Sequence, residues 1–139
     1  MVELSTVECQ DLLGRNHFGR LGFMDQVGVM PMIIPVNYLF HDGKVVFRTD
    51  PGSKLNAALH EAGVAFEVDG IDEAQKTGWS VVVRGHVEAV TDPVERDELA
   101  KASVEAWAPG EKPHYVRVNP RLVTGRRLSL EHLPSHWWG

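Results

Sequence analysis

The sequence contains a single cysteine and no long apolar run, and both shortages limit what the protein can be. Cys9 has no partner within the chain for a disulfide, so packing and hydrogen bonds have to hold the fold together. No segment approaches the about 18 consecutive apolar residues of a membrane-spanning helix, and the first residues lack the basic and apolar regions of a signal peptide. We therefore expect a cytoplasmic protein with no membrane contact.

An excess of positive charge and the common catalytic motifs are missing as well. The net charge is -5, which argues against nucleic acid as a partner. The nucleotide P-loop, the glycine-rich dinucleotide motif and the serine-hydrolase elbow are absent. The seven histidines are scattered, without the spacing of metal ligands. We predict no metal site, and no side chain stands out as catalytic.

Residues 48–55, Arg-Thr-Asp-Pro-Gly-Ser-Lys-Leu, form the most informative segment that is present. They follow an apolar, strand-like run, and Ser53 is a good N-cap for a helix that begins at Lys54. Arg48 and Lys54 supply positive charge, while Thr49 and Ser53 supply hydroxyl groups, so the loop suits a phosphate monoester. A strand, a turn and a capped helix without any ligand would use much the same residues.

The segment before this loop predicts a β-hairpin whose first strand lies at an edge. Asp42 and Gly43 separate two apolar runs, which is a strong hairpin signal. Pro31 and Pro35 cannot donate to a sheet ladder, so they indicate an edge or irregular strand. Free backbone groups on such a strand can bind a planar polar heterocycle, although prolines also protect an ordinary edge from aggregation.

In order and spacing, these segments and several others resemble the pyridoxamine 5'-phosphate oxidase-like superfamily of FMN-binding split barrels. The resemblance covers most of the chain and rests on residues 4–13, 19–23, 34–38, 47–49, 52–55, 64–69, 78–85, 116–120 and 123–128. It implies a mainly β fold with peripheral helices: an antiparallel split β-barrel, formed as one domain over residues 1–139. It also implies a homodimer with two FMN sites at the subunit interface.

The resemblance and the residues together suggest where FMN would bind. Trp79 has a simpler explanation as a core or interface aromatic. Neighbouring strand residues face opposite ways, so Arg126 and Arg127 are not expected to face the cofactor together; we favour Arg126 inward and Arg127 as a surface charge. The candidate cofactor-binding residues are Val36, Asn37, Arg48, Thr49, Ser53, Lys54, Trp79, Ser80 and Arg126.

Apolar periodicity and turn residues set the expected elements. Strands are expected at 17–24, 28–40, 45–49, 64–68, 79–91, 115–118 and 123–130, with a polar loop at 69–77. A capping box at Ser5 and Glu8 opens a first helix that stops before Gly14. Two further helices are expected from Lys54 to about residue 62 and from Pro93 to about Trp107.

The function that these patterns favour is that of an FMN-dependent oxidoreductase. It would move hydride or electrons between a nicotinamide cofactor and a small organic substrate, and the cofactor would supply the chemistry. Pyridoxamine 5'-phosphate oxidase activity itself is not expected, because no matching arginine-histidine substrate motif occurs near the C-terminus. The alternatives are a deazaflavin-dependent reductase, a flavin-binding protein for sensing or storage, and a barrel without ligand. Trp137 and Trp138 favour a docking surface or a tail folded onto its own subunit.

Overall fold

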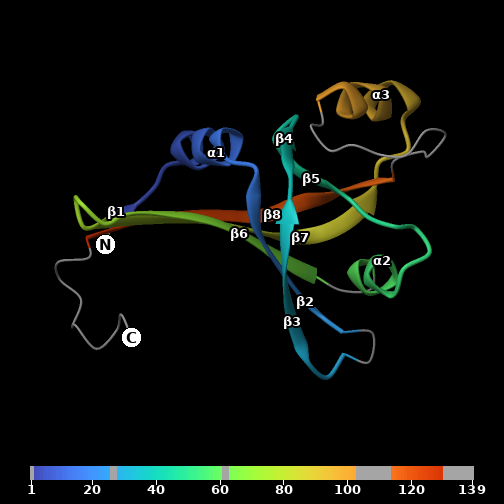
Figure 1. The fold of residues 1–139 in the computed structure, drawn as a ribbon, viewed down its shortest axis with the longest axis horizontal. Coiled ribbons are helices and arrows are strands. Elements are labelled where there is room, and N and C mark those ends of the chain that lie inside the picture. The colour runs from blue at the N-terminus through green and yellow to red at the C-terminus, as the bar shows by residue number, and fades with distance from the viewer. Residues whose placement is uncertain (1, 26–27, 61–62, 103–113, 130–139) are drawn as a thin grey trace.

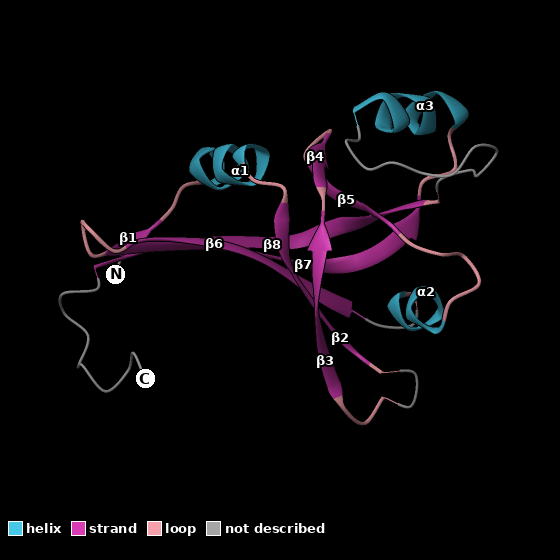
Figure 2. Cartoon of the chain, in the orientation of Figure 1, coloured by secondary structure: helices cyan, strands magenta, loops and turns pink. Residues whose placement is uncertain are grey.

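Antiparallel strands make up most of the protein, and short helices lie at the margins of the sheet (Figures 1 and 2). In the computed structural model, residues 2–25, 28–60, 63–102 and 114–129 are described. Their helices are α1 (Thr6–Arg15), α2 (Lys54–Leu59) and α3 (Pro93–Ala102). Their strands are β1 (Val2–Glu3), β2 (Phe18–Met24), β3 (Pro31–Asn37), β4 (Leu39–His41), β5 (Lys44–Arg48), β6 (Gly63–Asp72), β7 (Thr77–Ala89) and β8 (Tyr115–Ser129).

One sheet contains all of these strands, and it curls into half of a barrel. Its order is β3-β2-β6-β7-β8-β5-β4, and β1 pairs with the far end of β8. Strands β3 and β4 are at opposite ends of this order, yet only Tyr38 separates them in the chain. A flat sheet could not place its two edges so close together, so the sheet has to curl. The expected antiparallel split-barrel architecture, mainly β with peripheral helices, is confirmed.

Tyr38 is the residue at which the two edges meet, and its contacts fix the junction. Its side chain is 3% exposed, and its hydroxyl donates to the Leu13 carbonyl at 2.7 Å. That carbonyl lies in the last turn of α1, where helix carbonyls lack intrahelical partners. The Tyr38 backbone N–H donates to the His17 carbonyl at 2.8 Å, and its ring meets Phe66 edge-to-face at 4.8 Å. The expected single strand over residues 28–40 is therefore wrong, because the chain leaves one edge at Tyr38 and joins the other.

Short turns join β4 to β5 and β6 to β7. Asp42 and Gly43 have φ angles of 52° and 74° and join β4 to β5, as the hairpin signal predicts. The polar loop expected over residues 69–77 is wrong, because β6 continues to Asp72 and β7 begins at Thr77. Gly70 lies opposite Trp79, where an added Cβ would come 2.5 Å from the indole Nε1. Gly70 therefore marks the position where the Trp79 ring covers β6, and it does not indicate a loop.

The last strand is continuous where two strands were expected. β8 runs from Tyr115 to Ser129, and Pro120 is part of it. The pairing with β7 shifts at Arg84 and Gly85, whose partners are Leu122 and Pro120, so Arg121 is the extra residue of a bulge. A bulge tolerates proline within a sheet and restores the pairing beyond it.

The helix boundaries agree with the sequence at their starts and differ at their ends. The Ser5–Glu8 capping box is present, and Pro93 is the first residue of α3. Helix α1 continues to Arg15 and includes Gly14, while α2 ends at Leu59. The described part of α3 ends at Ala102, so its expected continuation to Trp107 falls outside the described residues, as do Trp137 and Trp138. None of the described helices is long and apolar enough to cross a membrane.

Two apolar clusters lie against the sheet. The larger one fills the curl and includes Leu21, Phe66 and Val81, with Cys9 from α1 buried in it. The smaller one contains Val46, Val90, Leu99 and Tyr115, and so lies where α3 meets β5 and β8. Burying these side chains is the largest favourable contribution to the free energy of folding, at about 25 cal/mol per Å² of apolar surface.

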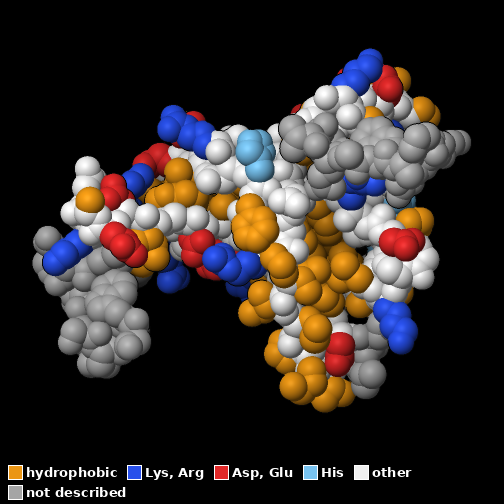
Figure 3. Space-filling view, viewed as in Figure 1, with side chains coloured by type: hydrophobic (Ala, Val, Ile, Leu, Met, Phe, Trp, Pro, Cys, Tyr) orange, Lys and Arg blue, Asp and Glu red, His pale blue; other side chains and the backbone are white. Residues whose placement is uncertain are grey.

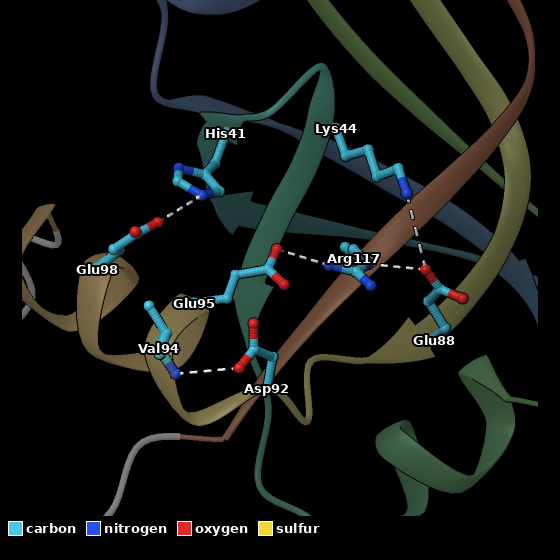
Figure 4. A network of polar contacts seen from close by, with 8 residues as sticks. All are labelled: His41, Lys44, Glu88, Asp92, Val94, Glu95, Glu98 and Arg117. Atoms are coloured by element: carbon cyan, nitrogen blue, oxygen red, sulfur yellow. Dashed lines mark hydrogen bonds and ion pairs between the residues drawn. The ribbon is translucent and has the colours of Figure 1, made fainter.

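A polar network holds α3 against the strands (Figure 4). Arg117 on β8 donates to Glu88 on β7 at 2.7 Å and to Glu95 on α3 at 2.6 Å. These hydrogen bonds raise the pKa of Arg117, the one to Glu88 most strongly. His41 on β4 lies 3.5 Å from Glu98, which adds a second link to the same helix.

We predict that Tyr38→Phe lowers the free energy of unfolding by about 1–3 kcal/mol, because it leaves the Leu13 carbonyl without its partner. Tyr115→Phe is the matched control. Tyr115 is equally buried, but its hydroxyl has no hydrogen-bond partner among the described residues. Its loss is expected to be neutral or stabilising. Urea denaturation of both variants checks this, and equal losses would contradict the role given to Tyr38.

Candidate functional site

The loop between β5 and α2 is built by its own hydrogen bonds. The Thr49 N–H donates to the His114 carbonyl at 3.0 Å, which anchors the start of the loop to the residue before β8. Ser53 caps α2, because its hydroxyl oxygen accepts from the Asn56 N–H at 3.0 Å. Asp50 folds the turn between them, since its side chain accepts from the Gly52 N–H at 3.1 Å. The predicted cap at Ser53 is confirmed.

Asn56 is a residue of this loop that the sequence analysis missed. Its side-chain oxygen accepts from the Thr49 hydroxyl at 2.9 Å, and its side-chain nitrogen donates to the Pro51 carbonyl at 3.3 Å. Asn56 therefore closes the loop from the first turn of α2. The available signal was its position three residues after the cap, where a polar side chain commonly turns back toward the N-terminus.

The two hydroxyl groups of the loop already donate within the protein. Thr49 donates to Asn56, and Ser53 donates to the Asp50 carbonyl at 2.7 Å. A phosphate dianion accepts hydrogen bonds and does not donate them, so either hydroxyl would have to rotate to reach one. Asp50 adds a negative charge close by. The charged side chains Arg48 and Lys54 are consequently the stronger candidates for holding an anion at this loop.

Arg48 and Lys54 lie at the two ends of the loop. Arg48 is the last residue of β5, opposite Tyr115 of β8, and is partly buried. Lys54 is exposed at the first position of α2. Next to Lys54 is a mostly apolar hollow of 350 Å³. It is lined by residues of β2, β3 and α2 that include Phe23, Ile34 and Leu55, and by Asp25, which follows β2. Cationic and apolar groups thus meet at one end of the sheet.

The candidate residues of β3 follow Ile34, which lines the hollow, along the same strand. Val36 is half-buried, packs against the larger core cluster and pairs with Gly19. Asn37 is exposed and pairs with Phe18. β3 stands at one end of the strand order, so among the described strands it pairs only with β2. This bears out the prediction from Pro31 and Pro35 that β3 is an edge strand.

Trp79, Ser80 and Arg126 lie near the other end of the molecule. The tip of the β6–β7 hairpin lies beside β1, whereas α2 lies at the opposite end of the long axis (Figure 1). Within one chain, the structure therefore does not bring these three residues to the loop of Arg48 and Lys54.

The pairing also separates these distal residues by face. Ser80 lies opposite Arg126, and Trp79 lies opposite Arg127. Directly opposed residues share a face and their neighbours take the other. Trp79 packs against the larger core cluster, so Arg127 is on the core-facing side and Arg126 on the outer side. Trp79 and Arg126 consequently lie on opposite faces of the sheet.

His114 lies next to the loop and carries a shifted pKa. Burial lowers the pKa of its imidazole below the usual value, and His60 and Arg96 add to the shift. Its Nε2 is buried without a hydrogen-bond partner among the described residues. His114 is thus neutral at neutral pH, and it adds no positive charge to the loop.

Within the described residues, no three His, Cys, Asp or Glu side chains converge in a way that could hold a metal ion. The groups that gather near the loop are cations, amides and apolar side chains, with Asp50 in the loop and Asp25 in the lining of the hollow as single carboxylates. Such a set suits an anionic organic molecule better than a cation.

Comparison with known proteins shows the family. The family model for pyridoxamine 5'-phosphate oxidase matches residues 5–127, so the chain belongs to this family. Rv0080 of Mycobacterium tuberculosis, an uncharacterized protein, is 36% identical over 133 residues, which cover 92% of this chain and 86% of that protein. The resemblance inferred from the sequence is confirmed.

Solved structures share the fold. The FAD-binding protein of Mycobacterium smegmatis is 35% identical and superposes with a TM-score of 0.77, over 92% of this chain and 98% of that one. A second FAD-binding protein, from Mesorhizobium loti, is 24% identical with a TM-score of 0.73, over 92% and 98% of the two chains. At that lower identity the likeness concerns the fold alone.

We predict that Asn56→Ala lowers the free energy of unfolding by about 1–2 kcal/mol, because two side-chain hydrogen bonds of the loop are lost. Gln10→Ala, at an exposed position on α1, is the control and is expected to change little. Urea denaturation gives the two free energies, and amide hydrogen exchange reports on the loop. Unchanged exchange at residues 49–53 in Asn56→Ala would contradict the closing role of Asn56.

Proposed function

We propose that the protein binds a flavin, with its phosphate at the loop of Arg48 and Lys54 and its ring beside β3. The observation that carries this proposal is an apolar hollow of 350 Å³ that Lys54 lines, at the end of a short loop that begins after Arg48. Ligand pockets are commonly apolar, with a few polar groups that fix orientation. Membership of the family and the flavin-binding relative at 35% identity support the same assignment.

The chain's own residues divide the work of holding such a ligand. Arg48 and Lys54 would neutralise the phosphate, and Thr49 and Ser53 would add hydroxyl groups after rotating away from their present acceptors. Phe23, Ile34 and Leu55 would exclude water from the ring, while Val36 and Asn37 would offer backbone groups of the edge strand. A bound flavin supplies hydride or electron transfer.

FMN and FAD are both candidates. FMN carries a phosphate monoester, which matches two cations at the ends of a short loop. FAD is favoured by one specific observation, the name of the Mycobacterium smegmatis protein. Titration with each compound decides between them. The absorbance of the purified protein distinguishes a flavin from a deazaflavin.

The reaction we propose is electron transfer from a nicotinamide cofactor to a small organic substrate. No nucleophile or acid–base pair is needed for such a reaction, because the cofactor carries the chemistry. Anaerobic mixing with NADH or NADPH tests this directly, since bleaching of the flavin absorbance reports reduction. A flavin that stays oxidised with either donor would favour a binding protein without turnover.

We further propose that two chains share each site in a homodimer. The support is the placement of the candidate residues: Lys54 and Arg126 lie at opposite ends of one chain, so a second copy would be needed to bring them together. Apolar side chains also gather over β2 and β3 (Figure 3), and Val29 and Met30 are exposed in the connection between these strands. Such a surface is typical of an interface.

We predict that Arg48→Ala and Lys54→Ala each weaken flavin binding by roughly tenfold to a hundredfold. Each removes one charge-assisted contact, worth about 1.5–3 kcal/mol. Titration of FMN into the purified variants, followed by quenching of flavin fluorescence, measures the dissociation constants. Wild-type affinity in both variants would reject the phosphate assignment.

A variant of the same loop with the opposite expected sign makes this test sharper. Asp50→Asn keeps the side-chain oxygen that accepts from the Gly52 N–H but removes the negative charge. Affinity for FMN is expected to rise by about threefold, because a like charge beside the phosphate is lost. The gain should shrink in high salt, while riboflavin, which lacks the phosphate, should bind Asp50→Asn and wild type alike.

The shared site is tested by mixing defective subunits. We predict that Lys54→Ala and Arg126→Ala each bind FMN poorly, and that a 1:1 mixture after subunit exchange recovers about a quarter of the sites, because one of two sites in each mixed dimer is intact. Binding is measured at an FMN concentration that neither variant retains alone. A monomer by sedimentation, or no recovery after proven exchange, would overturn the shared site.

A further inference from the structure

The outer face of the sheet has a row of side chains that is high at its ends and low in the middle. The row has one residue from each of β3, β2, β6, β7 and β8, and each residue lies directly opposite the next. In this order they are Ile33, Gly22, Ala65, Arg84 and Leu122. Opposed residues share a face, so the row crosses one surface. Ile33 and Leu122 are 73% and 49% exposed, whereas glycine and alanine leave the centre of the row empty.

The bulge in β8 adds a second cation to this row. Arg121 is the extra residue between the pairs Gly85–Pro120 and Arg84–Leu122. Bulges re-aim side chains, and they are frequent next to functional sites. Gly85 is required at this point, because a Cβ there would collide with the carbonyl oxygen of Asn119. The close backbone approach thus places Arg121 at the same hollow as Arg84.

The resulting hollow has a volume of 740 Å³ and is mostly apolar. Arg84, His86 and Arg121 are its only titratable groups within the described part of the chain, and no carboxylate is among its described lining residues. Arg20, by contrast with Arg84 and Arg121, has acidic partners. It lies on the same face, two residues from Gly22, and pairs with Glu67 at 3.7 Å and Asp69 at 3.2 Å. The cations of the hollow have no such acidic partner among the described residues.

We propose that this hollow is a second ligand site, for a small apolar anion: a ring or short chain that carries one carboxylate, sulfonate or phosphate group. Its volume lies in the range of small-molecule pockets, about 300–1,000 Å³. An anion would pair with Arg84 and Arg121, and the apolar body would lie on Gly22 and Ala65 between Ile33 and Leu122. The chain has a net charge of -5, yet these two guanidinium groups have no acidic partner among the described residues. The negative charge of such a ligand would neutralise their positive charge.

The site is distinct from the proposed flavin site and goes beyond the proposed function. The hollow beside Lys54 and this one share only Phe23 and Met32 among their described lining residues. Neither Arg84 nor Arg121 lines the hollow beside Lys54. A ligand in one hollow would therefore touch the wall of the other, while each keeps its own cations.

The experiment uses anilinonaphthalene sulfonate, a fluorescent apolar anion, titrated into the full chain with and without saturating FMN. Arg84→Gln and Arg121→Gln are each expected to weaken binding by about tenfold, since each removes a charge-assisted contact. Ala65→Leu is expected to weaken it as strongly by filling the floor of the hollow. Arg15→Gln, which removes an exposed cation on α1, is the matched control and should bind as wild type does.

Competition identifies the class of ligand. Naphthoate and octanoate should displace the probe, and whichever does so at the lower concentration shows whether a ring or a chain fits better. Naphthalenemethanol, which has the ring but no charge, should be at least tenfold weaker than naphthoate. Equal displacement by the charged and neutral rings would overturn the proposal.

Two further results would reject this site and leave the flavin proposal standing. If Lys54→Ala abolishes probe binding while Arg84→Gln and Arg121→Gln do not change it, the probe occupies the other hollow. If the wild-type chain binds no probe, or binds it only when dissociated to monomers, the hollow is closed in the protein as it exists. Loss of FMN binding alone would have no bearing on this result.

Discussion

The connection through Tyr38 is the constraint on which the rest of the structure depends. It joins β3 to β4, which stand at opposite ends of the strand order, with one intervening residue. Such a short link is possible only if the sheet curls until its edges meet. The buried ring, the hydroxyl bonded to α1 and the contact with Phe66 hold the edges there.

This curl decides which segments become neighbours. It brings the end of β5 and the start of α2 close to β2 and β3, so that Lys54 and Ile34 line one hollow. The same geometry leaves the long β6–β7 hairpin extended away from that end (Figure 1). A chain of this shape holds the candidate cofactor-binding residues at two separate places, which is the physical reason for the homodimer that we propose.

Small residues shape the two faces of the sheet as much as large side chains do. Gly70 allows the Trp79 indole to lie across β6, and Gly125 leaves room for Cys9 of α1, whose Sγ would be 2.5 Å from an added Cβ. Gly22 and Ala65 lower the outer face between taller neighbours. Gly70 and Gly125 are set by the side chains that pack over them, since native interiors leave little free volume.

Local features were determined by the sequence alone. The capping box at Ser5, the turn at Asp42 and Gly43, the cap at Ser53 and the edge character of β3 depend on residues within a few positions of each other. The family resemblance added the split-barrel fold. The break at Tyr38, the continuous β8, the clamp by Asn56 and the opposite faces of Trp79 and Arg126 were decided only in the tertiary structure. These depend on register and contact between segments distant in the chain, and a shift of one residue in register would reverse every face.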